Sequence, residues 1–370
     1  MGRLLLPAAY RQRQVRRALL PFLLSTLADA DWQSKADAGI QSKADALGPG
    51  LRALFLVGPT TLRRAGAGVS ENILKWDMKS TWTKLGAADG SVWCACIHGG
   101  KLYIGGQFAT INGLGSYSDL AMWDGAAWHD LGGANNAVYG LLSWGNYLVA
   151  SGAFSVIGGV ACSRIAKWDG VNWSPIGAGH PGGVGYQVIA NGPSGLLTAV
   201  DLVGPRSWDG SNWTTFGNGI DPPWGPAWWN YYAIGLIGST PYIGGIFTLG
   251  APVYEYVARW DGGAWVSIGN TDQQVSWLTP YNGLAMMGAF LNAGGANSYH
   301  AAEYSGAAWT RYGTTLNSWG RKALADGGDL YVCGDFTAPS NSLARWNGVW
   351  NAIAGVQGGG YGLCIGALAP

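Results

Sequence analysis

The sequence contains few charged residues. Charged residues make up 12% of its 370 residues, and only four residues are histidine. Disordered chains are rich in charge and poor in aromatic residues, so low charge beside 21 tryptophans excludes an intrinsically disordered protein. The apolar run at residues 18–28 is interrupted by Pro21 and is too short to cross a bilayer, which needs about 20 residues. No other apolar run is long enough to cross a bilayer, so we expect no membrane span.

Cysteine is also scarce. Five scattered cysteines are too few for a disulfide framework, and most lie in strand-like apolar runs where a thiol packs as a small hydrophobic group. Cys94, Cys96 and His98 alternate, so they would share one face of a strand, as the ligands of a metal site do. Because the matching positions of the other repeats are apolar, we predict no metal and no cofactor. The cysteines are Cys94, Cys96, Cys162, Cys333 and Cys364.

Glycine and tryptophan are abundant instead, with 61 and 21 copies. Glycine disfavours helices and aromatic residues favour strands, so the composition predicts an all-β protein. The phrase "RWDGGAWVSIG" at residues 259–269 sets two tryptophans around an Asp-Gly turn, and related phrases occur seven times at spacings of 40 to 52 residues. Their first aromatic residues are Trp76, Trp123, Trp168, Trp208, Trp260, Tyr304 and Trp346.

This period is typical of the blades of a β-propeller, and each repeat contains four strand-like segments. The Asp-Gly turn would join the two outer strands of a blade, with the paired rings packed on the sheet and the neighbouring blade. Residues 72–86 supply only a third and a fourth strand, whereas residues 361–368 supply only a first strand. We therefore predict that both ends complete one blade and close the ring, which removes exposed sheet edges. Seven blades are expected, with six as the alternative.

The repeat also resembles a known family. Gly105-Gly106 and Gly244-Gly245 follow apolar strands and precede an aromatic-Asp pair, with a Trp about six residues further on. This pattern resembles the kelch repeat over roughly residues 72–368, with Trp in place of the more usual Tyr. The phrase is also similar to the Trp-rich repeats of bacteriophage virion proteins and bacterial surface proteins. The resemblance implies a kelch-like β-propeller.

The N-terminal region differs from the repeats. Residues 1–70 contain ten Lys or Arg and four Asp, and residues 8–28 look helical on either side of Pro21. We predict a basic, partly helical docking arm and linker at residues 1–70, followed by the propeller at residues 71–370. A solvated linker is the alternative. The arginines expected to dock on other proteins of a larger assembly are Arg11, Arg13, Arg16 and Arg17.

Catalytic motifs are missing from the repeats. A copper site like that of galactose oxidase needs paired His and Tyr residues, but the four histidines fall at unmatched places in their repeats. Sialidase-type Asp boxes have a different spacing from "SWDGSNW", and no matching arginine cluster for a carboxylated sugar is apparent. We predict no catalytic residue, although an active site built from several loops would leave little local trace.

One segment stands out from the repeats as a binding candidate. "DPPWGPAWWNYY" at residues 221–232 combines prolines with clustered aromatic residues in the longest spacing between repeats. Such a loop suits stacking on sugar rings or a protein contact; the alternative is that its rings fold onto the propeller. The predicted ligand-binding residues are Trp224, Trp228, Trp229, Tyr231 and Tyr232.

These features together favour a non-enzymatic structural and binding protein of a virion, such as a phage tail or fibre component. Its arm would attach it to a larger oligomeric assembly, and its propeller would recognise a host glycan or surface protein. With so few charges on the propeller, nucleic acid is not an expected partner. The alternative is a secreted, extracellular carbohydrate-active enzyme, acting as a hydrolase, lyase or oxidase.

Overall fold

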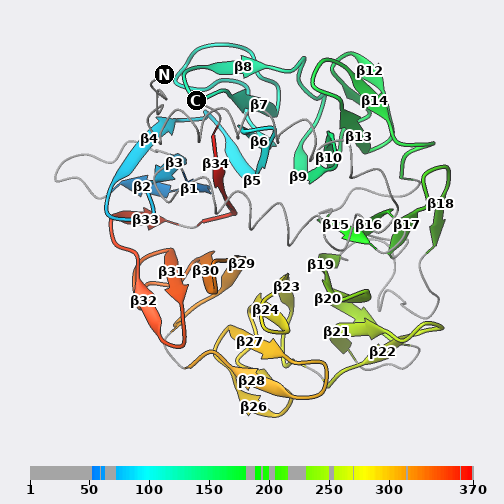
Figure 1. Ribbon diagram of the computed structural model, residues 1–370, viewed down its shortest axis with the longest axis vertical. Coiled ribbons are helices and arrows are strands. Elements are labelled where there is room, and N and C mark those ends of the chain that lie inside the picture. Colours follow the sequence, from blue (N-terminus) through cyan, green and yellow to red (C-terminus); the bar gives the residue numbers. More distant parts are fainter. Residues whose placement is uncertain are drawn as a thin grey trace, which may run out of the picture. The chain divides into compact units, whose positions relative to one another are not determined.

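The computed structural model describes residues 52–58, 60–62, 72–180, 188–192, 195–199, 205–215, 231–249, 254–269, 271–313, 316–358 and 360–368. Within these ranges the chain forms no α-helix, and no segment has a helix with the length and apolar character needed to cross a membrane. The described strands form seven four-stranded antiparallel sheets arranged around an axis, as Figure 1 shows. The predicted all-β propeller is confirmed.

Each sheet is one blade, and its strands run in order from the axis to the rim. Blade 1 consists of β34 (Gly362–Ala367), β1 (Arg52–Val57), β3 (Ile73–Trp76) and β4 (Trp82–Gly86), and blade 2 of β5 (Ser91–His98), β6 (Lys101–Gln107), β7 (Leu120–Trp123) and β8 (Trp128–Asp130). Blade 3 consists of β9 (Val138–Trp144), β10 (Tyr147–Gly152), β13 (Ile165–Trp168) and β14 (Trp173–Pro175). Blade 4 consists of β15 (Val188–Gly192), β16 (Gly195–Ala199), β17 (Arg206–Trp208) and β18 (Trp213–Thr215).

Blades 5 to 7 follow the same plan. Blade 5 consists of β19 (Tyr231–Ile237), β20 (Thr240–Thr248), β21 (Tyr254–Trp260) and β22 (Trp265–Ser267). Blade 6 consists of β23 (Val275–Pro280), β24 (Leu284–Gly288), β27 (Ala301–Tyr304) and β28 (Trp309–Arg311). Blade 7 consists of β29 (Gly320–Asp326), β30 (Asp329–Gly334), β31 (Leu343–Trp346) and β32 (Trp350–Ala352). Three two-stranded sheets pair β2 (Thr60–Leu62) with β33 (Val356–Gly358), β11 (Val156–Ile157) with β12 (Val160–Ala161), and β25 (Asn292–Ala293) with β26 (Ala296–Asn297).

Blade 1 closes the ring with strands from both ends of the described chain. The C-terminal strand β34 pairs along its whole length with β1, in a register that sets Arg52 opposite Ala367 and Val57 opposite Gly362. Strand β1 in turn pairs with β3, and β2 pairs with β33. The predicted closure is therefore confirmed. Strand β1 is paired on both of its edges, with β34 on the axis side and β3 on the rim side.

The boundary of the propeller lies earlier than the sequence analysis placed it. Residues 52–57, assigned there to the docking arm, form the second strand of blade 1 with five of their six side chains buried. The compact unit accordingly begins at Arg52 and not at residue 71. The reason is local: apart from Arg52, the run "RALFLV" is apolar and belongs beside the strands of the repeats, whereas most of the basic residues precede it. Arg11, Arg13, Arg16 and Arg17 lie outside the described residues.

The paired aromatic residues of the repeated phrase lie directly opposite each other on the two outer strands. This holds for all seven phrases, including Trp76 with Trp82 in blade 1 and Tyr304 with Trp309 in blade 6, and the ring centroids lie 5.2 to 6.0 Å apart. Figure 1 shows these strands at the rim. The predicted outer hairpin is confirmed.

In six of the seven pairs, the second tryptophan also ties its blade to the preceding one. The Trp173 indole N–H donates to the backbone carbonyl of Leu131 at 3.0 Å, and the Trp82 indole N–H donates to Ala354 at 2.9 Å across the closure. The other recorded bonds join Trp128 to Leu85, Trp213 to Ile176, Trp309 to Ile268 and Trp350 to Tyr312. These bonds repeat around the ring, so the tryptophans hold neighbouring blades in register.

Glycine beside the paired aromatic rings is required by their close packing. Gly177 has a φ of +58°, and a Cβ atom there would lie 2.5 Å from the Trp208 ring. Gly158, in the loop beside Trp173, has a φ of +57°, and its Cβ would lie 2.3 Å from that ring. Only glycine combines the left-handed backbone with such a close approach.

The aspartates of the Asp-Gly turns shape the outer hairpins. Asp124 Oδ1 accepts the backbone N–H groups of Ala126 and Ala127, and Asp261 Oδ1 accepts those of Gly263 and Ala264. These bonds favour the charged carboxylate and hold the pKa of each aspartate below its ordinary value. These aspartates therefore have a structural role, which is to stabilise the turns.

The hydrophobic core lies between neighbouring blades. In one cluster, Cys94 and Leu120 of blade 2 pack with Val138, Leu148 and Phe154 of blade 3. The phenylalanine that ends the second strand of most repeats is buried each time, at Phe108, Phe154, Phe247, Phe290 and Phe336. Each blade is consequently stabilised by its neighbours, and closure stabilises the first and last blades alike.

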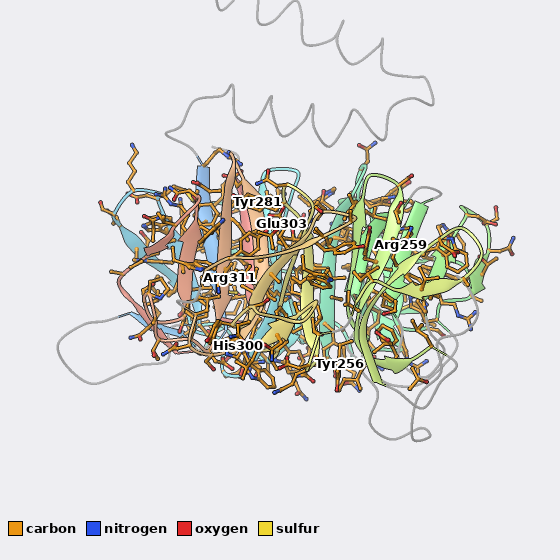
Figure 2. The ribbon with its side chains drawn as sticks, turned by 90° about the horizontal axis from the view of Figure 1, so that it is seen from below. Tyr256, Arg259, Tyr281, His300, Glu303 and Arg311 are labelled. Carbon is orange, nitrogen blue, oxygen red and sulfur yellow. The ribbon has the colours of Figure 1, made fainter. Side chains whose placement is uncertain are left out.

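The propeller has two faces. We call the side on which the innermost strands begin the bulge face, and the side of the tight turns between the innermost and second strands the hairpin face. Figure 2 shows His300, which precedes the third strand of blade 6, on the bulge face and Tyr281, in the hairpin turn of that blade, on the other.

Candidate functional site

A β-bulge recurs at the start of the innermost strands. In five blades the register shifts there, so that one residue has no partner opposite it on the second strand. In blade 1, Tyr361 stands immediately before β34 and donates its backbone N–H to Val57 at 2.9 Å. We call these six positions the bulge ring: Trp93, Tyr139, Tyr232, Ser276, Arg321 and Tyr361. Bulges redirect side chains and are common beside binding sites.

Aromatic and cationic side chains of the bulge ring contact one another from blade to blade. The rings of Trp93 and Tyr139 stack with centroids 5.1 Å apart and planes 30° apart. The Arg321 guanidinium lies 4.7 Å from the centroid of the Tyr361 ring and 5.7 Å from that of Trp319. Asp335 accepts two hydrogen bonds from Arg321, at 2.9 and 2.6 Å, and fixes its orientation.

Lys322 connects the ring of residues across several blades. Its ammonium group donates to the backbone carbonyl of Trp93 at 2.9 Å, although the two residues are 229 positions apart. It also lies 4.9 Å from the centroid of Trp277, whose indole N–H donates to the Ala323 carbonyl at 2.7 Å. Burial lowers the pKa of Lys322, and no carboxylate contacts it in the described part of the chain.

The arrangement suits ligand binding by stacking. Flat faces of Trp, Tyr and Arg side chains offer contact area to rings or planar groups while their polar edges donate hydrogen bonds. The side chains come from the first strands of consecutive blades, so their relative positions are set by closed sheets and not by a single loop. Such preorganisation lowers the ordering cost of binding.

The predicted aromatic platform is only partly within the described residues. Trp224, Trp228 and Trp229 lie outside them, so their role stays a prediction. Tyr231 and Tyr232 begin strand β19, the innermost strand of blade 5, with Tyr231 opposite Gly245. Placing these two tyrosines in a loop was therefore wrong: the strand-like run that follows them pairs with β20 and extends back to include them. Tyr232 is the bulged position of its blade.

The suspected metal ligands are used in packing. Cys94 is 3% exposed, and burial raises the pKa of its thiol to about 12; burial does the same for Cys96. The His98 ring lies 2.9 Å from the Ser143 hydroxyl through Nδ1. Among the residues the structure describes, no group of three or more His, Cys, Asp or Glu side chains is placed to hold a metal ion.

A hydrogen-bonding pattern that the sequence analysis did not predict also recurs in several blades. Asp89 accepts the backbone N–H groups of Ala109 and Thr110, at 2.8 and 3.0 Å, and thereby clamps the loop that follows Phe108. The same clamp is made by Asn135, Asp272 and Asn317 in their blades. Each stands three residues before the column of Val92, Val138, Val275 and Gly320, a spacing that was available in the sequence. Asp89 and Asn135 also border a surface pocket of about 550 Å³.

Comparisons with known proteins assign no family to this chain. No protein-family model matches this chain, and no curated protein matches it. Among solved structures, a chain of the mitotic checkpoint complex has 15% identity and a TM-score of 0.47, covering 75% of this chain and 84% of that one. The computationally designed Ika8 protein has 12% identity and a TM-score of 0.48, covering 84% and 94%. A putative 6-phosphogluconolactonase from Bacteroides fragilis has 12% identity and a TM-score of 0.46, covering 85% and 98%.

Proposed function

We propose that this protein is a non-enzymatic recognition module whose propeller binds a carbohydrate at the bulge ring. The observation that carries the proposal is the recurrence of bulged residues at one end of the innermost strands, most of them aromatic. Sugar rings present apolar C–H faces that stack on aromatic side chains and need no charge on the protein. Arg321 and Lys322 add hydrogen-bond donors for sugar hydroxyls at the same end.

The wider setting of this binding is proposed from the sequence. The Trp-Asp-Gly phrase resembles repeats of bacteriophage virion proteins, and the segment before Arg52 is basic and rich in leucine. A tail or fibre component that displays the propeller to a host glycan or surface protein fits both features. The N-terminal segment would then attach the propeller to the other proteins of the virion.

The carboxylates of the described region give less support to the alternative, a carbohydrate-active enzyme. Glycosidases use a pair of carboxyl groups, one of them with a raised pKa. Here Asp124, Asp169 and Asp261 accept backbone N–H groups in turns, which lowers their pKa values, and Asp272 clamps a loop. Burial raises the pKa of Asp119 and of Glu255, but Asp119 accepts the backbone N–H of Phe108 and Glu255 accepts the Ser267 hydroxyl, so both carboxylates also serve the fold. Recognition without catalysis is therefore the function that we favour.

The test is binding of the full-length protein to an array of immobilised neutral and acidic oligosaccharides. Trp93 and Tyr139 are both replaced by Ser, the residue that blade 6 itself carries at the bulge as Ser276. A sugar ring gains affinity from the aromatic surface on which it stacks. We therefore expect the affinity of the double variant for the bound glycan to fall at least about tenfold. Its circular dichroism spectrum and melting temperature should stay close to those of the parent.

A matched control lies at the hairpin face. Trp144 and Tyr147 form another inner-strand aromatic pair, with ring centroids 6.3 Å apart, and their replacement by Ser should leave binding unchanged. Replacing Trp228 and Trp229 by Ala tests whether the predicted aromatic segment contributes as well. Absence of binding to every glycan, or equal loss in the control pair, would contradict the proposal.

A further inference from the structure

Three basic side chains meet at the rim between blades 3 and 4, away from the bulge ring. Arg164 precedes β13 in blade 3, His180 follows β14, and Arg206 begins β17 in blade 4. The Arg164 guanidinium donates to the His180 carbonyl at 3.3 Å through Nη1. The His180 ring lies 4.5 Å, centroid to centroid, from the ring of Trp213.

Several nitrogen atoms of this group are buried and have no hydrogen-bond partner among the residues that the structure describes. They are the two ring nitrogens of His180 and the Nε atoms of Arg164 and Arg206, and His180 is only 1% exposed. Unpaired buried polar atoms are uncommon in native proteins and call for a bound water or ion. The two arginine Nε–H groups and one nitrogen of the neutral His180 ring are donors, and the arginines are permanently charged, so an anion satisfies these groups better than a cation does.

The electrostatics point to the same ligand charge. Burial, together with the charges of Arg206 and Arg164, lowers the pKa of His180 to about 3. No carboxylate in the described part of the chain pairs with either arginine. Asp209, which follows Trp208 in the chain, has its Oδ1 atom tied to the backbone N–H groups of Ser211 and Asn212.

A pocket of about 220 Å³ opens beside Arg206 and the Trp213 ring, which the His180 ring contacts. Its lining includes Arg206, Trp208, Trp213, Gly179 and Asn212. At about 30 Å³ for each water molecule, this volume corresponds to roughly seven waters, which is room for one sugar-sized ligand. Aromatic walls beside an arginine suit a ring that carries an acidic group.

The loop that holds His180 is fixed before any ligand arrives. The His180 backbone N–H donates to the Ser163 carbonyl at 2.9 Å. Gly179 has a φ of +77°, and a Cβ atom there would lie 2.4 Å from Ser163. Because the backbone is already held, binding costs little ordering of the loop.

We infer that this rim pocket is an anion-binding site for the carboxylate of an acidic monosaccharide unit, with Arg206 binding the carboxylate, Trp213 bordering the sugar ring and the charge of Arg164 adding to the attraction. The site goes beyond the proposed function because it is separate from the bulge ring. The sequence analysis found no arginine cluster at matching positions of the repeats. Arg164 and Arg206 stand at unmatched places in their repeats, and both lie near His180 because blades 3 and 4 are neighbours.

The experiment follows the His180 ring in the full-length protein by NMR with 13C-labelled histidine. The chain has four histidines, so the spectrum is simple, and His180→Gln assigns the signal. Glucuronate is titrated beside glucose, inorganic phosphate and inorganic sulfate. We expect glucuronate to shift the His180 signal in a saturable manner and glucose to leave it unchanged. Saturable shifts with phosphate or sulfate and none with glucuronate would overturn the assignment to an acidic sugar.

Two variants separate binding from folding. Arg206→Gln should weaken glucuronate binding at least tenfold without lowering the melting temperature, because Arg206 has no recorded ionic partner whose loss would destabilise the fold. Arg311→Gln is the control: Arg311 is exposed on β28 (Figure 2), and its replacement should leave the titration unchanged. Unaltered binding in Arg206→Gln, or an equal loss in Arg311→Gln, would refute the inference. Because the bulge ring is intact in both variants, neither result decides the proposed function.

Discussion

Trp173→Phe tests whether the outer tryptophans hold the blades together. Trp173 is 5% exposed, and its indole N–H donates to the Leu131 carbonyl of the preceding blade at 3.0 Å. Phenylalanine keeps an aromatic ring against Trp168 but cannot donate this bond. It also leaves empty part of the space filled by the larger indole.

The magnitude follows from these two losses. An acceptor left unpaired in a buried setting costs about 1–3 kcal/mol, and truncating a buried side chain by a few atoms adds about 1 kcal/mol. We therefore expect Trp173→Phe to lower the free energy of unfolding by about 2–4 kcal/mol. Urea unfolding followed by tryptophan fluorescence and by far-UV circular dichroism measures this difference, provided that the dependence on denaturant is the same in both proteins.

Trp319→Phe is the control for this measurement. Trp319 is 36% exposed, and no hydrogen bond from its indole is recorded in the described structure. Its replacement should change the free energy of unfolding by less than about 0.5 kcal/mol. If Trp173→Phe were as stable as the parent, or if both variants lost the same stability, the interblade hydrogen bond would not support the fold as described.

Three further predictions concern glycine, acid and thiols. Gly158→Ala should destabilise far more than Gly159→Ala in urea unfolding, because both positions have positive φ but only a Cβ at Gly158 meets the Trp173 ring; equal losses would contradict this. Hydrogen bonds from the backbone of Thr81, Lys79 and Ser80 lower the pKa of Asp77 to about 2, below its unfolded value, so its contribution to stability is complete above about pH 4 and is lost as the pH falls towards 2. Asp77→Asn should flatten that part of the curve of melting temperature against pH, and an unchanged curve would refute the role. Burial raises the pKa of Cys94 and Cys333 to about 12, so neither thiol should react with a disulfide reagent at pH 8 until urea unfolds the protein; rapid reaction in the folded state would show that the inner strands are open.

The outer half of each blade was predictable because its determinants are local. Two aromatic residues around an Asp-Gly turn specify a hairpin within a dozen residues, and the structure places all seven pairs as expected. Strand β1 was missed although "RALFLV" is as apolar as the second strands of the repeats. It follows a basic segment, and its innermost partner β34 lies at the other end of the chain.

The candidate sites depend on pairing that a single repeat does not encode. The bulge ring carries Trp, Tyr, Ser and Arg at one structural position, so no recurring letter marks it. Its existence follows from one extra residue in the innermost strand, which becomes visible only when the register with the second strand is known. Likewise, Arg164 and Arg206 occupy different places in their repeats and meet only because neighbouring blades pack together.

The central claim is that the two ends of the described chain form one blade and close the ring, which places Tyr361 beside Arg321. Amide hydrogen exchange of the full-length protein, read for residues 362–367, tests it most directly. If β34 pairs with β1 as described, these amides should exchange as slowly as those of β23, an innermost strand inside the ring. Exchange at the rate of an unstructured peptide would contradict closure and, with it, the position of the bulge ring.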